Sequence, residues 1–156
     1  MQNNKTFGFK AQMAIGDKGE KDFLKRYKDL NPVKSEDRAI DFHLSDGKTV
    51  ELKSDSYPME KTENMFFETL SDMDSGKIGG VHRAKRDKID YFVYYYPTNK
   101  TFFWFDVDKL HAAVEKLIKS GSYKAKIIRN SRWLTQGYAL PRSAFKDIIL
   151  KEDVFS

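Results

Sequence analysis

Two aromatic segments, residues 89–96 and 101–105, constrain the fold more than any other feature of this chain. The first reads Ile-Asp-Tyr-Phe-Val-Tyr-Tyr-Tyr, the second reads Thr-Phe-Phe-Trp-Phe, and Pro97-Thr98-Asn99-Lys100 between them is a turn sequence. Segments this rich in aromatic residues predict strands, and the first is apolar enough to be central in a sheet. These rings are too numerous to be base-stacking platforms, so most of them belong to the core or to a dimer surface.

The first helix is predicted to begin near Asp17. Asp17 followed by Glu20 resembles a capping box, and Asn31-Pro32 ends the helical pattern. Apolar residues recur between these limits at helical spacing: Phe23, Leu24, Tyr27 and Leu30. This face is expected to pack on the sheet.

The rest of the chain alternates between strand and helix patterns. Strands are predicted at residues 38–44, 49–54 and 64–70, and a short basic helix at 81–88 follows three glycines. Asp106 or Asp108 caps a helix with Gly121 at its end, and Pro141 is expected to open a last helix through Leu150. The order predicts an α/β fold in a single domain over residues 1–156, with one central mixed β-sheet flanked by helices.

Composition excludes several classes of protein. The 156 residues include no cysteine, so disulfide frameworks, Cys-ligated zinc and thiol nucleophiles are excluded, and any metal must be held by oxygen or by the three histidines. No apolar run reaches the ~18–20 residues that span a bilayer, and the polar start lacks a signal-peptide core. We expect a cytoplasmic protein without a membrane partner.

The net charge of +5 is unevenly distributed. Basic and acidic residues balance up to residue 60, so the surplus lies beyond it. Residues 119–132 contain no acid and five basic side chains: Lys119, Lys124, Lys126, Arg129 and Arg132. Such a stretch suits a phosphate backbone, and a solvated helix end followed by a loop is the alternative interpretation.

Asp41, Glu51 and Lys53 are the strongest candidates for catalysis. Strand alternation places Glu51 and Lys53 on one face of the segment 49–54. A two-residue loop would direct Asp41 and Glu51 to opposite faces, whereas a three-residue loop, with Gly47 in the left-handed conformation, pairs Asp41 with Glu51. Glycine stands at the position that the three-residue loop requires.

Two carboxylates facing each other repel unless a cation lies between them. Oxygen ligands suit a hard cation, Mg²⁺ or Mn²⁺, and Lys53 would then orient or deprotonate an attacking water or neutralise charge on a phosphate transition state. The alternative is a set of exposed cross-strand charge pairs, worth roughly 0.2–1 kcal/mol each. Glu20, on the packing face of the first helix, either completes the capping box or reaches toward this site.

This order of elements resembles the PD-(D/E)XK nuclease superfamily, which has the restriction-endonuclease-like fold. A helix with Glu20 precedes Asp41, then come Glu51-Leu52-Lys53, and a strand and a helix lead to a hydrophobic strand. The resemblance covers roughly residues 17–96, and the arrangement is similar to that of phage junction-resolving endonucleases and of small phage-encoded nucleases. Ile40 stands where the family name has proline.

The resemblance implies a Mg²⁺-dependent phosphodiesterase that cuts DNA. Asp41 and Glu51 would bind Mg²⁺ or Mn²⁺ with the backbone carbonyl of Leu52, Lys53 would serve the nucleophilic water, and Glu20 would be an accessory helical acid. A junction resolvase and a non-catalytic DNA-binding domain on the same fold are the alternatives. Cutting both strands would require a homodimer, whereas a nicking monomer also fits, and a phage-encoded enzyme would act in the host cytoplasm.

Further candidates surround this core. His43 shares a strand face with Asp41, and Glu68 could add a carboxylate, although ordinary hydrogen-bonded or solvated roles suit both. His82, Arg83, Lys85 and Arg86 follow two glycines and would meet a phosphate, or form a solvated helix face. The residues expected to contact nucleic acid are Arg83, Lys85, Arg86, Lys124, Lys126, Arg129 and Arg132, with Trp133, Gln136 and Tyr138 beside them.

Overall fold

The aromatic pair forms the centre of a six-stranded sheet. In the computed structural model, which describes residues 9–37, 40–129 and 132–156, the pair is β6 (Tyr91–Tyr96) and β7 (Thr101–Asp106), joined antiparallel. The sheet order is β1-β2-β3-β6-β7-β10, and its other strands are β1 (Val33–Lys34), β2 (Phe42–His43), β3 (Thr49–Ser54) and β10 (Ile149–Val154). Because β3 runs parallel to β6 and the other pairings are antiparallel, the central sheet is mixed, as predicted.

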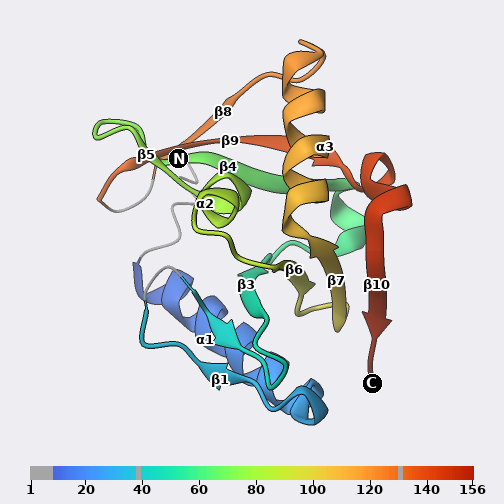
Figure 1. The fold of residues 1–156 in the computed structure, drawn as a ribbon. Coiled ribbons are helices and arrows are strands. Elements are labelled where there is room, and N and C mark those ends of the chain that lie inside the picture. The colour runs from blue at the N-terminus through green and yellow to red at the C-terminus, as the bar shows by residue number, and fades with distance from the viewer. Residues whose placement is uncertain (1–8, 38–39, 130–131) are drawn as a thin grey trace.

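One face of this sheet is covered by α1 (Phe9–Arg26), followed by the short 3₁₀ helix η1 (Lys28–Leu30) (Figure 1). Phe23 and Tyr27 of the helical segment pack on Val50, Val93 and other rings of the sheet. Gly19 permits the close approach, since a Cβ at this position would lie 1.9 Å from Oγ of Ser54 at the end of β3. The helix therefore lies directly against the strand that carries Glu51.

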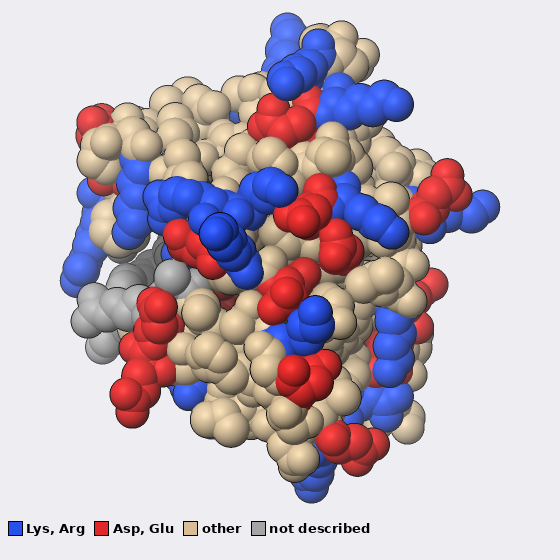
Figure 2. All heavy atoms as spheres, viewed as in Figure 1, with Lys and Arg blue, Asp and Glu red and all other residues tan. Residues whose placement is uncertain are grey.

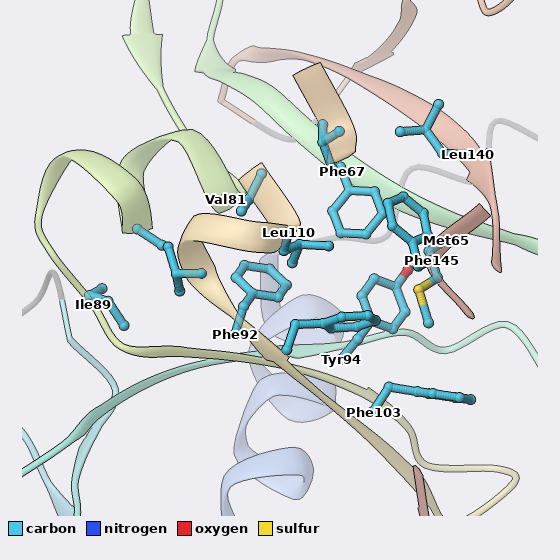
Figure 3. Packing of buried hydrophobic residues seen from close by; sticks show 14 of the residues in the cluster. Met65, Phe67, Val81, Ile89, Phe92, Tyr94, Phe103, Leu110, Leu140 and Phe145 are labelled. Atoms are coloured by element: carbon cyan, nitrogen blue, oxygen red, sulfur yellow. The ribbon is translucent and has the colours of Figure 1, made fainter. Parts of the chain in front are cut away.

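The opposite face is covered by α2 (Gly80–Arg86), α3 (Val107–Lys119) and a second sheet (Figure 1). That sheet has the order β5-β4-β9-β8 and consists of β4 (Asn64–Asp72), β5 (Lys77–Ile78), β8 (Lys126–Arg129) and β9 (Leu134–Pro141). Phe67 of β4 packs among Phe92, Tyr94 and Phe145, the last from the 3₁₀ helix η3 (Arg142–Ile148) (Figure 3). Another 3₁₀ helix, η2 (Met59–Lys61), precedes β4.

Several predicted elements are confirmed. The strand at 49–54 is β3, the strand at 64–70 lies within β4, and the basic helix at 81–88 corresponds to α2. Asp106 is the N-cap of α3, accepting a hydrogen bond from Lys109 N–H, and Gly121 beyond its end has φ +74°. Among the described residues, no helix is both long and apolar enough to cross a bilayer.

The predicted start of the first helix is wrong. The helix begins at Phe9, so Asp17 and Glu20 lie in its interior and form no capping box. The pattern of Asp and Glu three residues apart suits a first turn, but it also arises by chance on one face of a longer helix. Leu24, expected on the packing face, is 36% exposed.

Four further expectations are corrected. The strand predicted at 38–44 is only two residues long, with residues 38 and 39 outside the described part, and Ile89 and Asp90 precede β6 rather than joining it. The helix expected from Pro141 to Leu150 is instead the 3₁₀ helix η3 followed by β10, which pairs with β7. The strand at 64–70 belongs to a second sheet with three unpredicted strands, not to a single central sheet.

Candidate active site

The hairpin between β2 and β3 brings Asp41 close to Glu51. Phe42 pairs with Val50, His43 pairs with Thr49, and the loop 45–47 ends at Gly47 with φ +86°. The three-residue loop with a left-handed glycine is therefore confirmed. Just before β2 the register shifts, because the N–H of Asp41 donates to the carbonyl of Val50, the partner of Phe42, at 3.1 Å. Asp41 still lies close enough to Glu51 for its charge to raise the pKa of that residue.

Asp41 is anchored to the backbone of the neighbouring strand. Its Oδ2 accepts a 2.7 Å hydrogen bond from the N–H of Leu52. Burial raises the pKa of Asp41, the Leu52 N–H opposes the rise, and the nearby charge of Glu20 adds to it. Since the N–H and C=O of one strand residue point to the same edge, the Leu52 carbonyl faces the side of β3 where Asp41 lies.

Glu51 is a buried carboxylate with one oxygen paired and one unpaired. Its side chain is 13% exposed, and Oε1 accepts a 2.6 Å hydrogen bond from Nη2 of Arg83 on α2. Oε2 of Glu51 and Nε of Arg83 are both buried without a hydrogen-bond partner. Burial, followed by the charge of Asp41, raises the pKa of Glu51 to about 8, although Arg83 acts in the opposite direction. The site thus contains an acceptor and a donor that the protein does not satisfy.

Lys53 lies two residues after Glu51, on the face of β3 opposite to Val50 and Leu52, which belong to the core under α1. The Nζ of Lys53 lies 5.7 Å from the ring centroid of Phe66 on β4. Gly137 of β9 leaves room for that ring, because a Cβ there would lie 2.4 Å from its Cζ. The second sheet therefore contacts Lys53 through Phe66.

Glu20 reaches the same region from α1. Its Oε2 accepts a 2.8 Å hydrogen bond from Nζ of Lys34 on β1, and its side chain is 27% exposed. Glu20 lies close enough to Asp41 for its charge to raise the pKa of that residue. Of the two roles predicted for Glu20, the structure excludes the capping box and leaves the position near the acids.

Glu68 also approaches the site, whereas His43 pairs elsewhere. The charge of Glu68, on β4, contributes to the raised pKa of Glu51. Gly79 and Gly80 pack closely against Glu68. A Cβ at position 80, where φ is +55°, would lie 2.7 Å from the backbone carbonyl oxygen of Glu68. His43 is exposed, and its Nε2 lies 3.1 Å from Oγ of Ser35.

The residues expected to bind nucleic acid fall into two groups. Those of α2 are paired with acids: Arg83 with Glu51, Lys85 with Asp108, and Arg86 with Asp87. Those near β8 are exposed, and Lys124, Lys126 and Arg129 form no ion pair with any described residue, while Arg132 and Trp133 are exposed beside them. Acidic groups are interspersed with basic ones over the face in Figure 2, so no field of one sign covers it.

Sequence reasoning missed the pairing partners around the site. Arg83 was assigned to nucleic acid, but its guanidinium contacts Glu51, and Lys34 was not singled out at all. It also missed a contact between His82 on α2 and Glu115 on α3. The spacing of His111 and Glu115, four residues apart on a predicted helix, was the signal available for that cluster.

The oxygen atoms at the site fit a hard cation in part. Oε2 of Glu51 has no partner, and no described residue donates a hydrogen bond to Oδ1 of Asp41. Mg²⁺ commonly uses one or two carboxylates and keeps several waters, so the number of carboxylates at the site does not exclude it. The chain matches no protein-family model, no curated protein and no solved structure.

Proposed function

We propose that this chain is a metal-dependent DNA endonuclease of the PD-(D/E)XK type, which hydrolyses backbone phosphodiester bonds with a Mg²⁺-activated water. The observation that carries the proposal is the closeness of Asp41 to Glu51 beside one hairpin, with a buried unpaired oxygen on Glu51 and Lys53 on the same face of β3. Two converging, partly desolvated acids are unfavourable by themselves and favourable around a cation.

The path of the chain supports the proposal. α1 carries Glu20, the strand after Asp41 leads to the strand of Glu51-Leu52-Lys53, and α2 returns the chain to β6, which lies parallel to β3. This is the order on which the resemblance to the restriction-endonuclease-like fold rests. The proposed metal ligands therefore lie on β3 and just before the start of β2.

Asp41 and Glu51 would hold the ion, together with the Leu52 carbonyl on the same edge. Mg²⁺, or Mn²⁺ in its place, supplies Lewis-acid polarisation of a phosphate oxygen and an acidified water when bound. The Leu52 N–H fixes the orientation of Asp41, and Arg83 fixes that of Glu51. Fixed carboxylates lose little conformational entropy on binding, which favours ion capture.

Lys53 would orient the attacking water and neutralise charge that develops on the phosphate. Its ammonium group lies over the Phe66 ring and forms no ion pair with any described acid. The unpaired Nε–H of Arg83 is a donor suited to a phosphate oxygen, since a guanidinium can donate to several oxygens at once. Glu20 would support the site through its charge near Asp41.

DNA cleavage assays test the proposal. The protein is incubated with supercoiled plasmid and with branched DNA, in Mg²⁺ and in EDTA. We expect Mg²⁺-dependent cutting that Lys53→Ala lowers by at least ~100-fold, the usual contribution of a positioned acid or base. Lys28→Ala, which removes an exposed lysine from η1, serves as the matched control and should cut like the wild type.

Each outcome has a distinct meaning. Preference for branched DNA would identify the junction resolvase. Binding without cutting in Mg²⁺ would identify the non-catalytic DNA-binding domain. Cutting in EDTA, or full activity of a folded Lys53→Ala variant, would refute the mechanism.

A further inference from the structure

A second group of potential metal ligands lies between α2 and α3. It consists of His82 on α2 with His111 and Glu115 on α3. One ligand atom of each residue lies within 4.8 Å of the other two, and within the described part of the chain no other trio of His, Cys, Asp or Glu is this close. None of the three residues takes part in the proposed nuclease site.

The local sequence explains why these side chains converge. His111 and Glu115 are four residues apart on α3, so they share one face of that helix. His82 points from α2 to the same face, where its Nε2 contacts Oε1 of Glu115. The His82 and His111 rings are nearly perpendicular, at 79°, with centroids 5.0 Å apart.

The hydrogen bonding of this cluster is incomplete. Nδ1 of His82 is buried without a hydrogen-bond partner, and a buried polar atom in a native protein usually has one. The side chains of His82 and Glu115 are only 18% and 31% exposed, so both are held by their surroundings rather than extended into water. Oε2 of Glu115 lies 3.8 Å from Nζ of Lys119. The three residues are therefore close together, and His82 has one polar atom that the protein does not satisfy.

We propose that His82, His111 and Glu115 bind one Zn²⁺ ion, with a water or an external ligand at the fourth position. Tetrahedral zinc ligands at about 2.0–2.2 Å from the ion lie about 3.3 Å apart, so small side-chain rotations from the observed separations complete the set. Two imidazoles and a carboxylate are a zinc-type donor set, whereas Mg²⁺ prefers oxygen alone. The two sites are therefore expected to select different metals.

The fourth position is open to solvent. A groove on the surface of α3 is lined by His111 and Glu115 together with Ala112, Lys116, Lys119 and Ser120. An ion that three protein groups hold at the edge of this groove can retain an exchangeable fourth ligand, as open zinc sites do. The ordinary alternative is that His82 and Glu115 merely link the two helices, as Lys85 and Asp108 do at 2.8 Å.

Zinc titration of the full chain distinguishes these cases. Zn²⁺ is added to chelator-treated protein in excess Mg²⁺, which occupies the carboxylate site, and binding is followed by calorimetry. We expect one ion per chain, and a loss of affinity of at least ~100-fold in His111→Ala and in Glu115→Gln, more than the ~10–100-fold typical for groups that only support a ligand. His43→Ala, which removes the third and exposed histidine, is the matched control and should bind as the wild type does.

Circular dichroism verifies that each variant is folded before titration, and Glu115→Gln keeps the result informative if His111→Ala is unstable. Absence of a one-site isotherm in the wild type, or equal affinity in Glu115→Gln and wild type, would overturn the proposal. Asp41→Asn should bind Zn²⁺ unchanged, so the outcome does not depend on whether the chain is a nuclease.

Discussion

Glu51→Gln should stabilise the metal-free protein while it abolishes Mg²⁺-dependent cleavage. The raised pKa of Glu51 means that the folded chain retains a proton that the unfolded chain has released. Between the ordinary value of 4.5 and about 8, the unfolded state therefore binds fewer protons, and the free energy of unfolding falls as pH rises. Below that range Glu51 is protonated in both states and contributes nothing.

The magnitude follows from the linkage. Each pKa unit corresponds to about 1.4 kcal/mol, so the interval from 4.5 to about 8 corresponds to about 5 kcal/mol as an upper limit. Water entering the opened site and movement of Arg83 reduce this value, and we expect about 2–4 kcal/mol above pH ~8. Glutamine retains an oxygen that can accept the hydrogen bond from Arg83. It removes the negative charge that the charges of Asp41 and Glu68 repel.

Urea unfolding in EDTA, from pH ~5 to pH ~9, measures the effect. The two proteins should be equally stable near the acid end, and Glu51→Gln should be the more stable at the alkaline end. Mg²⁺ should raise the stability of the wild type and leave that of Glu51→Gln unchanged, because ligands stabilise only the state that binds them. Glu63→Gln, which neutralises an exposed acid, is the control and should follow the wild type. Parallel curves for wild type and Glu51→Gln would show that Arg83 fully compensates the charge, and the argument for a cation would fail.

Two other predictions concern the far end of the sheet and the basic strand. Asp153, on β10, accepts hydrogen bonds from Arg26 at 2.6 and 2.9 Å and from the Tyr27 hydroxyl at 2.7 Å, and Arg26 holds its pKa at about 2. Asp153→Asn should therefore lower the free energy of unfolding by about 2 kcal/mol at neutral pH. The difference in stability between the two proteins should vanish as the pH falls from 3.8 toward about 2, because the carboxylate of the wild type becomes protonated. An undiminished difference near pH 2 in urea titrations would contradict this. Replacing Lys126 and Arg129 by glutamate should weaken DNA binding. It should also lower the slope of log affinity against log salt by about 1 for each lost phosphate contact, whereas Lys61→Glu, at an exposed position on η2, should leave both unchanged. An unchanged slope in anisotropy titrations of the double variant would exclude β8 from the DNA interface.

The hairpin that carries the candidate site was predictable because its register depends on local chemistry. Gly47 is the residue that a three-residue loop needs at a positive φ, and the alternation of residues 49–54 then fixes which side chains share a face. The aromatic pair at the centre was predictable for a similar reason, since its apolar length leaves no position other than a buried one.

The C-terminal strand and the second sheet depend on distant contacts that local patterns do not contain. Asp153 is opposite Phe102 in the pairing of β10 with β7, and Gly137 is opposite Glu68 in that of β9 with β4. Tertiary pairing overrides the helical preference suggested by Pro141. The contact of Arg83 with Glu51 likewise joins two elements through a fold that spacing alone does not specify.

The exposed edge of β8 has a consequence for the behaviour of the protein at high concentration. Ile127 and Ile128 are 60% and 42% exposed on a strand that lies last in its sheet, a combination that invites pairing with another chain. Lys126 and Arg129 flank these isoleucines, and two copies approaching edge to edge would bring like charges together. The same two cations therefore protect the molecule from aggregation, and a variant that neutralises rather than reverses them is expected to precipitate first.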